Sequence, residues 1–433
     1  MKSIGIDIGT TTISGVVYDS VEDRNVHSVT VDNGSFIRSE NDWERIQDAG
    51  GIVDKAAGVL DDLLEKYPEV NAIGLTGQMH GILYTDADGK AVSPLFTWQD
   101  GRGNLSVDGD KSLSDSLRGK YGKNVSSGYG LVTHIWNVKN ARVPKGAASM
   151  ATIGDYLGMY LTGRRRPLIH ISNAASLGFF DAGSKCFDAK ILEAEGVDTA
   201  LLPEVTKEFS PLGEYRGIPV SAAIGDNQAS FLGSAGLNEG YVLLNMGTGG
   251  QISVLSDKPF ESEGIEARPL TADKYLLVGA SLCGGRAFAI VERFFREYVK
   301  AATGQEEPQF KTLSALAEKG AQGDRSLRFS TLFMGSRTDP SARGSIGNIS
   351  EDNFTPEAFA YGVFEGMARE LYDMYSVIKR GTGVSAGRLI ASGNALRMNP
   401  ALQDIFSEMF NAPLQLSKYK EEAAAGAAIT AAS

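Results

Sequence analysis

One short stretch near the start of the chain has the residue types of a phosphate-binding turn. Residues 7–12 read Asp-Ile-Gly-Thr-Thr-Thr and separate two apolar runs. Hydroxyls and consecutive backbone N–H groups in such a turn can bind the oxygens of a phosphate chain. An ordinary hairpin needs only Asn-Gly or Asp-Gly at this place. Taken alone, the stretch favours a plain turn over a phosphate loop, since Gly-Thr turns are common.

A second stretch offers hydrogen-bonding side chains at the end of an apolar run. Gln78, Met79 and His80 lie between two glycines, which let the backbone approach a ligand closely. Gln and His supply both donors and acceptors. A single histidine can equally be a satisfied structural residue, so function and structure are balanced here.

A third stretch, residues 97–102, combines an aromatic ring with charged groups. Trp98 could stack on the C–H face of a polyhydroxy compound, while Asp100 and Arg102 bind its hydroxyls. The alternative is an Asp-Gly turn with a nearby ion pair, and by itself that alternative is favoured.

Two stretches in the second half of the chain complete the set. Asp226 and Asn227 follow an apolar run and begin a helix, where a carboxylate could act as general base toward a hydroxyl nucleophile. As a helix cap alone, Asp226 needs no such function. Gly393 and Asn394 form a turn before a helix that could approach an adenine or a ribose.

These stretches belong to a pattern that occurs twice. Residues 3–20 and 241–257 both read as strand, Gly-Thr turn and strand, and residues 71–81 and 387–399 both read as a strand that ends in a small residue, Gly and an amide. Between them, apolar residues at steps of three and four predict helices over 43–67 and 354–378, the second with a cap and a proline in 353–356. The repeat predicts two α/β domains that bind a phosphate chain between facing turns, with a boundary near 213–219.

Composition limits the class of protein. The 433 residues suit two domains, and a net charge of −11 argues against nucleic acid or an anionic membrane as main partner. There is no basic-then-apolar leader and no apolar stretch near ~20 residues, so we expect a cytoplasmic protein. Cys186 and Cys283 are expected to be buried, and residues 423–432 to form a closely packed Ala-rich helix.

Together, these motifs resemble the FGGY carbohydrate kinases. The resemblance covers essentially the whole chain, and Gln78-Met79-His80 with the Trp-x-Asp-Gly-Arg stretch is similar to the ketose kinases of that family. Further similarity to its sedoheptulokinase-like members lies in residues 126–130, 173–178, 228–230 and 281–285. The implied fold class is α/β, with two ribonuclease-H-like domains of the actin/hexokinase/Hsp70 type, 1–217 and 218–433, and an active-site cleft between them.

The resemblance implies an ATP-dependent kinase for the terminal hydroxyl of a ketose, with sedoheptulose preferred. Asp226 would be the catalytic base, and Asp7 and Asp226 would hold Mg²⁺. The implied sugar-binding residues are Gln78, Met79, His80, Trp98, Asp100, Arg102, Asp226 and Asn227. The implied ATP-binding residues are Gly9, Thr10, Thr11, Thr12, Gly247, Thr248, Gly284, Gly393 and Asn394. The expected partners are the sugar and ATP, without nucleic acid or membrane, and a homodimer is left open.

Two features depart from the family. Ser14 stands where relatives often carry Arg or Lys, and the chain is shorter than most relatives, which leaves one phosphate contact and the oligomeric contacts open. The alternatives are a xylulokinase or another pentulose or polyol kinase, and a non-enzymatic actin-fold ATPase switch. The sugar-side set speaks against the switch, since a switch needs only the phosphate loops.

Overall fold

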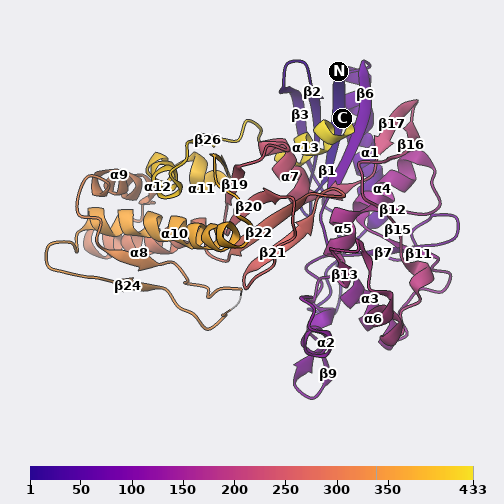
Figure 1. The fold of residues 1–433 in the computed structure, drawn as a ribbon, viewed down its shortest axis with the longest axis horizontal. Coiled ribbons are helices and arrows are strands. Elements are labelled where there is room, and N and C mark those ends of the chain that lie inside the picture. The colour runs from indigo at the N-terminus through magenta and orange to yellow at the C-terminus, as the bar shows by residue number, and fades with distance from the viewer. Residues whose placement is uncertain (338, 433) are drawn as a thin grey trace. The chain divides into compact units, whose positions relative to one another are not determined.

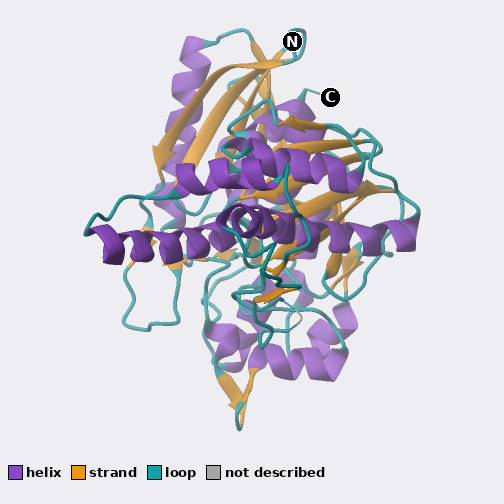
Figure 2. Cartoon of the chain, turned by 90° about the vertical axis from the view of Figure 1, so that its left-hand side faces the viewer, coloured by secondary structure: helices purple, strands orange, loops and turns teal. Residues whose placement is uncertain are grey.

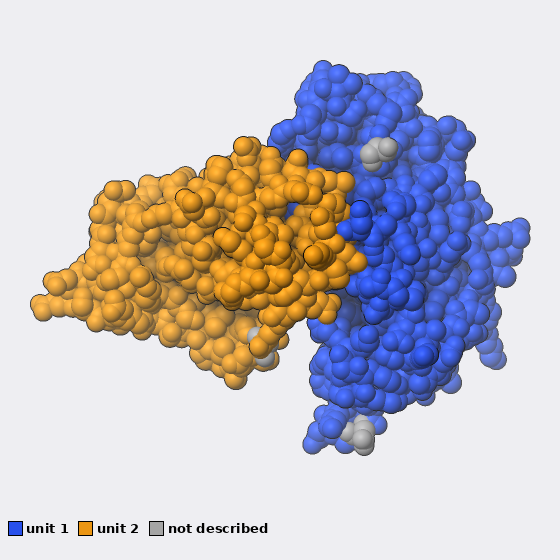
Figure 3. Space-filling model, in the orientation of Figure 1, with its two compact units in different colours: residues 1–236, 269–273, 418–433 blue, residues 237–268, 274–417 orange. Residues whose placement is uncertain are grey.

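The chain forms two compact units (Figure 3). The computed structural model describes residues 1–337 and 339–432, except for the side chain of residue 108. Unit 1 comprises residues 1–236, 269–273 and 418–433, and unit 2 comprises residues 237–268 and 274–417. Each unit has its own sheet and its own hydrophobic core.

A seven-stranded sheet is the frame of unit 1. Its order is β16-β17-β6-β1-β2-β3, and β18 also pairs with β6. The strands are β1 (Lys2–Ile8), β2 (Thr12–Asp19), β3 (Arg24–Asp32), β6 (Val70–Gly77), β16 (Pro211–Tyr215), β17 (Ile218–Ser221) and β18 (Ile224–Gly225). β1 runs antiparallel to β2 and parallel to β6, and β17 and β18 run parallel to β6. The hairpin predicted around residues 9–11 is therefore confirmed.

The two faces of β1 pack against different helices, because successive side chains of a strand point to opposite faces. Ile4, Ile6 and Ile8 join the core formed with α1 (Ala49–Lys66) and α4 (Ile153–Thr162). The other face lies against α13 (Glu422–Ala431), seen in yellow beside indigo β1 in Figure 1.

This approach of α13 is unusually close. A Cβ placed on Gly5 would lie 1.8 Å from the carbonyl oxygen of Ala424, so no larger residue fits at position 5. α13 packs in turn on α7 (Asp226–Ala235). The predicted Ala-rich helix is confirmed. Asp7 is two residues after Gly5, so it lies on the same face of β1, the face toward α13.

The sheet of unit 2 repeats the strand order of unit 1. Its order is β21-β22-β20-β19-β25-β26. The strands are β19 (Tyr241–Met246), β20 (Gly250–Ser256), β21 (Ile265–Pro269), β22 (Tyr275–Ser281), β25 (Arg388–Ser392) and β26 (Leu414–Leu416). β19 runs antiparallel to β20 and parallel to β25, and β26 runs parallel to β25. The series β3-β2-β1-β6-β17 thus corresponds to β22-β20-β19-β25-β26, which confirms the repeat.

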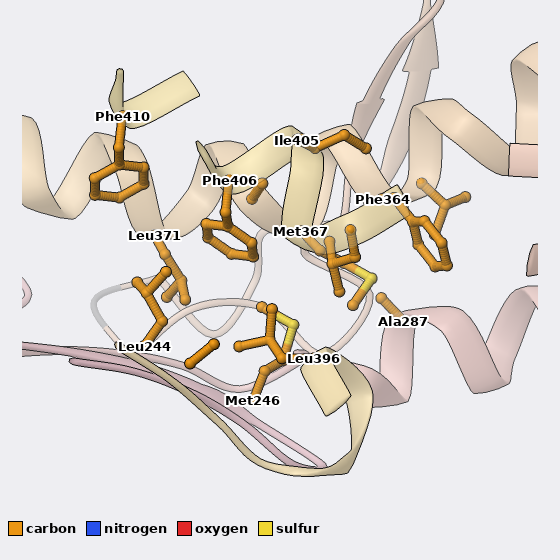
Figure 4. Packing of buried hydrophobic residues seen from close by; sticks show 14 of the residues in the cluster. Leu244, Met246, Ala287, Phe364, Met367, Leu371, Leu396, Ile405, Phe406 and Phe410 are labelled. Atoms are coloured by element: carbon orange, nitrogen blue, oxygen red, sulfur yellow. The ribbon is translucent and has the colours of Figure 1, made fainter. Parts of the chain in front are cut away.

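Helices cover the sheet of unit 2 (Figure 2) and share its core. They are α8 (Gly285–Thr303), α9 (Phe310–Gly320), α10 (Pro356–Thr382) and α12 (Pro400–Phe410). In Figure 4, Leu244 and Met246 of β19 lie near Leu371 and Met367 of α10 and Phe406 of α12. All five side chains are buried.

The predicted long helices hold in part. The helix expected over 354–378 is α10, with Thr355 as its cap and Pro356 at its first position. The helix expected over 43–67 begins only at Ala49, so the prediction is wrong for residues 43–48. Ile46 and Gln47 instead form a short strand, β5, because they pair with β4 and β8.

The remaining elements are short. In unit 1 they are β4 (Phe36–Ile37), β5 (Ile46–Gln47), β7 (Leu83–Thr85), β8 (Leu95–Phe96), β9 (Ser106–Asp108), β10 (Lys111–Ser112), α2 (Leu113–Tyr121), α3 (Gly130–Lys139), β11 (Ser149–Ala151), β12 (Leu168–His170), α5 (Ile171–Ser176), β13 (Phe180–Asp181), β14 (Cys186–Phe187), α6 (Ala189–Ala194), β15 (Glu204–Thr206) and 3₁₀ helices at Arg102–Asn104 and Thr199–Leu201. In unit 2 they are β23 (Arg328–Ser330), β24 (Ser345–Gly347) and α11 (Asn394–Arg397).

The compact units divide at a different place from the predicted 217/218 boundary. Residues 211–221 form the β16–β17 hairpin, and β17 pairs with β6 inside the unit 1 sheet. The division falls after Gly236, and residues 418–433 return to unit 1. A Gly/Pro-containing turn marks a hairpin here, where the sequence alone suggested a link between domains.

The cysteine prediction is half right. Cys283 is buried, but Cys186 is exposed, because it lies in the two-residue strand β14 of a small hairpin. Within residues 1–337 and 339–432, none of the helices combines the length and apolar character needed to cross a membrane.

Candidate active site

Three parallel strands of unit 1 bring the predicted groups to one edge of the sheet. Ile8, Gly77 and Gly225 are aligned across β1, β6 and β18. The residues that follow these three, Gly9, Gln78 and Asp226, therefore form a common row along this edge of the sheet. The row includes the turn at residue 9 and the stretch from Gln78. Ligands of open α/β sheets bind outside the carboxyl ends of their strands.

Asp7 is the carboxylate nearest this edge on β1. Its Oδ1 is buried without a hydrogen-bond partner. Burial, with the nearby carboxylates of Asp226 and Glu421, raises the pKa of Asp7 to about 7. A carboxylate in such surroundings is better stabilised by a cation than by water.

The carbonyl oxygens of the Gly-Thr turn accept hydrogen bonds from Asn33 and Gln47. Asn33 donates its side-chain N–H to Gly9 O at 2.8 Å and its backbone N–H to Thr11 O at 2.8 Å. Gln47 donates its side-chain N–H to Thr10 O at 2.9 Å. With three successive carbonyls bound on one side, the turn has the conditions for an anion-binding concavity of N–H groups on its other side.

His80 is held in an uncommon backbone conformation. Its φ is 72°, in the left-handed region. Its backbone N–H donates to Ser176 Oγ at 3.1 Å, and its Nδ1 lies 2.7 Å from Ser176 O. Because a carbonyl only accepts, Nδ1 must carry the proton. The ring also stacks on Tyr129, 4.6 Å between centroids, so its orientation is fixed.

The strand before Asp226 is held by buried side chains. Gly225 donates its N–H to Ser172 Oγ at 2.9 Å, and Thr76 donates its hydroxyl to Ile224 O at 2.9 Å. Asn173 donates to Ala223 O at 2.9 Å. The short helix α5 therefore supports both His80, through Ser176, and the strand that precedes Asp226.

Asp226 itself is the first residue of α7. The cap position is occupied by Gly225, so Asp226 lies one residue inside the helix and not at the cap position that the alternative interpretation gave it. Asn227 follows on the same first turn. Met79 is buried, and its Sδ would lie 2.8 Å from a Cβ on Gly225, so it fills the space beside this strand end.

Trp98 is the predicted sugar-binding residue with the most exposed side chain, at 47%. Its indole Nε1 donates to Thr10 Oγ1 at 2.9 Å. The exposed ring can therefore offer a stacking face while its edge is fixed to the phosphate turn.

Asp100 and Arg102 lie elsewhere, in the interior of unit 1. Each is 1% exposed. Arg102 donates to both oxygens of Asp100, at 2.6 and 3.1 Å, and to Asn137 Oδ1 at 2.6 Å. Its guanidinium lies 4.2 Å from the ring centroid of Phe96. Direct sugar contact by these two residues stays a prediction, and their burial favours a supporting role below Trp98.

Unit 2 contains a cavity of about 1050 Å³. Its walls include four of the predicted nucleotide-binding residues: Gly247, Thr248, Gly393 and Asn394. The other lining residues are Gly285, Arg286, Phe288, Ala289, Phe310, Lys311, Ser314, Ala315, Glu318, Ala395, Met398 and Asn399. A partly apolar cavity of this size with a few polar groups is typical of a small-molecule site.

Gly284 supports the wall of the cavity without lining it. A Cβ on Gly284 would lie 2.3 Å from Gly249 O, so a glycine is required where the chain passes the turn. Gly393, in contrast, has a φ of 87° and begins the turn before α11. Both glycines are thus needed for backbone geometry.

Several supporting residues were missed from the sequence. They are Asn33, Gln47, Thr76, Ser172 and Ser176 in unit 1, and Gly285, Arg286 and Phe288 in unit 2. Single polar residues inside apolar runs give no signal of a long-range partner. Ser14, where the resemblance implied a basic residue, is buried with its Oγ 3.0 Å from Thr30 Oγ1, so it supports the sheet.

Comparison with known proteins shows the family of the chain. Residues 3–233 match the N-terminal domain, and residues 242–433 the C-terminal domain, of the FGGY family of carbohydrate kinases. Mouse (Mus musculus) sedoheptulokinase is 28% identical over 99% of this chain and 96% of its own length.

Solved structures share the fold. The xylulose kinase from Rhodospirillum rubrum superposes with a TM-score of 0.83 and 22% identity over 100% of this chain and 89% of its own. The Plasmodium falciparum glycerol kinase with ADP superposes with a TM-score of 0.81 and 20% identity over 99% of this chain and 88% of its own. The predicted two-domain fold and family resemblance are confirmed, and kinase membership implies the use of ATP. The chain belongs to the FGGY family of carbohydrate kinases and is itself a carbohydrate kinase.

Proposed function

We propose that the chain phosphorylates the terminal hydroxyl of a ketose with ATP, and that this ketose is sedoheptulose. The observation that carries the proposal is the common row at the carboxyl ends of β1, β6 and β18, which brings together the turn at residue 9, the stretch from Gln78, and Asp226. The likeness to mouse sedoheptulokinase over nearly the whole chain supports the choice of sugar.

The sugar would bind to unit 1. Trp98 offers an exposed aromatic face for the C–H groups. The His80 ring is fixed by Ser176 and Tyr129, so it is suited to a directed hydrogen bond with a sugar hydroxyl. A hydroxyl matched to a fixed partner discriminates between sugars more strongly than an apolar contact does.

Asp226 is the proposed general base. Its carboxylate would take the proton of the terminal hydroxyl while the hydroxyl oxygen bonds to the γ-phosphorus and the bond to the β–γ bridging oxygen breaks. The products are a sugar phosphate and ADP. The buried hydrogen bonds of Ser172 and Thr76 hold the strand before Asp226, so the carboxylate is positioned before the sugar arrives.

In unit 1 the Gly-Thr turn is the proposed site for nucleotide phosphates, and in unit 2 the cavity is the proposed nucleotide site. Thr11 and Thr12 are exposed on the turn. In unit 2, Gly247, Thr248 and Asn394 line the cavity. Gly393 lines the same cavity.

The residues at the turn fit Mg²⁺. Asp7 has a buried, unpartnered Oδ1 and a raised pKa beside Asp226, so a cation would relieve an unfavourable charge. No group of three or more His, Cys, Asp or Glu in the described part of the chain is arranged to hold a metal. Mg²⁺ does not require one, because it keeps several waters and takes one or two carboxylates plus phosphate oxygens. When bound, it would neutralise phosphate charge.

A coupled ADP-release assay tests the proposal. Ketoses, polyols and aldonates are compared at fixed ATP and Mg²⁺, and the phosphorylated product is identified by NMR. We expect the highest kcat/KM with sedoheptulose and a phosphate on its terminal carbon. A higher value with xylulose or another pentulose would transfer the assignment to a pentulose kinase. No sugar-dependent ADP release would remove the proposal altogether.

The His80→Ala variant sharpens the sugar assignment. It should raise the KM for the ketose or lower kcat, with little change in the KM for ATP. A change confined to the KM for ATP would show that His80 serves ATP binding and not sugar binding. The proposal also includes a cytoplasmic location.

A further inference from the structure

A closed ring of three hydrogen bonds joins Thr10 of the Gly-Thr turn, Gln78 and Gln47 in unit 1, and Trp98 donates a fourth hydrogen bond to Thr10. We propose that Gln47 is a positioning residue that acts through this ring, so that the sugar-side tryptophan and the phosphate turn keep their geometry together. The two ligand names rest on the proposed function, but the ring itself does not.

The ring begins and ends at Thr10. Trp98 Nε1 donates to Thr10 Oγ1 at 2.9 Å, and Thr10 Oγ1 donates to Gln78 Oε1 at 3.4 Å. Gln78 Nε2 donates to Gln47 Oε1 at 2.9 Å. Gln47 Nε2 then donates to the backbone oxygen of Thr10 at 2.9 Å. The side chain and the main chain of one turn residue are thus connected through two amides.

The direction of every bond in the ring is determined. An indole N–H can only donate and a carbonyl can only accept. Thr10 O therefore requires the nitrogen of Gln47, which leaves the oxygen of Gln47 for the nitrogen of Gln78. The oxygen of Gln78 then faces the Thr10 hydroxyl, whose proton it accepts. Turning over Gln47 would break both of its bonds, and turning over Gln78 would break its bond to Gln47.

Burial makes the ring costly to break. Gln47 is 0% exposed and Gln78 is 4% exposed. A buried polar group that loses its partner keeps the full penalty of leaving water, and a fully satisfied buried network favours one arrangement. The 3.4 Å bond from Thr10 to Gln78 is the longest of the four and the weakest.

The ring changes the role expected for two predicted residues. The hydroxyl proton of Thr10 is committed to Gln78, so the Thr10 side chain supports the turn rather than donating to phosphate. Gln78, expected to bind sugar directly, has its amide nitrogen and oxygen both in the ring. Gln47 is completely buried, so its effect on either ligand must pass through the ring.

The Gln47→Glu variant gives the proposal a distinctive pH signature. A carboxylate at position 47 cannot donate to Thr10 O, whereas the protonated acid can donate there and still accept from Gln78. Burial raises the pKa of such a carboxyl. We expect kcat/KM for both ketose and ATP to be about tenfold below wild type at pH 8, and the deficit to shrink by pH 6. Gln322→Glu, exposed in unit 2, controls for the added charge.

A double-mutant cycle tests whether the ring acts as one unit. Trp98→Phe removes the indole donor to Thr10, and Gln47→Met removes both bonds of the second amide. Members of one network are non-additive, whereas independent sites add. We expect the double variant to lose clearly less kcat/KM than the product of the two single losses.

Two outcomes would overturn the proposal. One is a deficit in Gln47→Glu that is equal at every pH or confined to one substrate. The other is an additive cycle. If Gln47→Glu does not fold, Gln78→Glu makes the same pH test, since it keeps the acceptor toward Thr10 and loses only the donor to Gln47.

Calorimetry with MgADP separates the ring from the proposed function, because it needs no sugar turnover. We expect Gln47→Glu to bind MgADP several-fold more weakly than wild type at pH 8, with recovery at pH 6. An unchanged affinity for MgADP would overturn the proposed positioning role of Gln47. A wild-type protein that phosphorylates no ketose would overturn only the proposed function.

Discussion

The Gly-Thr turns of the two units occupy equivalent positions in equivalent sheets, but they are supported by different groups. In unit 1, the carbonyls of Gly9 and Thr10 accept hydrogen bonds from the side-chain amides of Asn33 and Gln47. These amides come from segments well separated in sequence from the turn. The support depends on two particular side chains.

In unit 2, the same support comes from the main chain. Gly285 donates its backbone N–H to Gly247 O at 2.8 Å, and Arg286 donates to Thr248 O at 3.1 Å. The donors are the first residues of α8, which passes close to the turn because Gly284 has no side chain.

The difference shows how a duplicated fold can specialise. Side-chain support can be connected to other side chains, and in unit 1 it is connected to Gln78 and Trp98 on the proposed sugar side. Main-chain support needs only a helix start and a glycine, and it leaves the cavity wall to other residues. We therefore expect the turn of unit 1 to be sensitive to substitution of its supporting amide side chains, and the turn of unit 2 to be sensitive to substitution of glycines.

The largest effect is expected in unit 1, at Asp226. Asp226→Asn keeps the shape and the helix start but removes the proposed proton acceptor. General-base catalysis contributes typically about 10²- to 10⁴-fold, so kcat should fall by that order, measured by ADP release. MgADP affinity and the unfolding temperature should scarcely move.

Asp188→Asn is the matched control, because Asp188 also starts a helix of unit 1 and accepts from Ile191 N–H. Asn caps a helix about as well as Asp, so this control should keep full activity. Near wild-type turnover in Asp226→Asn would make its carboxylate structural and place the base elsewhere.

The next effect is expected in unit 2, at Gly284. A Cβ there would lie 2.3 Å from Gly249 O, so Gly284→Ala must displace main chain at the turn. We expect the KM for ATP to rise more than about tenfold and the unfolding temperature to fall. Gly247→Ala is the comparison for stability, since its Cβ meets nothing within 4 Å. Equal unfolding temperatures for both variants would contradict main-chain support.

A smaller effect is expected at the amide support of unit 1. Asn33→Asp keeps the shape but loses the side-chain donor to Gly9 O. A buried group left unsatisfied costs about 1–3 kcal/mol, so the KM for ATP should rise about tenfold. Asn353→Asp is the control: it is an equally buried amide of unit 2 that donates to Ser326 Oγ. It should lower stability and leave the KM for ATP unchanged, and a similar KM in both variants would contradict the role of Asn33.

The sequence predicts the frame of this molecule well. Apolar runs with a Gly-Thr turn occur twice, and both become the β1–β2 and β19–β20 hairpins. The strand before Gln78 and the helix start at Asp226 are also local patterns, and parallel strands bring their ends to one edge. Local pattern thus predicts which residues reach the site.

The supporting contacts could not be predicted in the same way. Gln47 lies within a segment whose periodicity favours a helix, yet pairing with β4 and β8 makes it a strand. Asp100 and Arg102 have the residue types of a ligand site, but their partner Asn137 and the ring of Phe96 bury them. Such partners are distant in sequence, and residue type alone does not distinguish a group that binds a ligand from one that supports it.

The smallest effect is expected at Thr11, which is exposed beside Thr10 on the same turn. Thr11→Val removes a hydroxyl proposed to face phosphate and keeps the shape. A typical hydrogen bond contributes about 0.5–1.5 kcal/mol, so the KM for ATP should rise only two- to tenfold, with unchanged unfolding temperature and ketose KM. Thr10→Val is the matched comparison, because it breaks the ring to Trp98 and Gln78 and should also raise the KM for the ketose. Identical profiles for the two variants would mean that both hydroxyls serve the turn alike. A folded Thr11→Val with normal ATP kinetics would make that hydroxyl part of an ordinary hairpin turn.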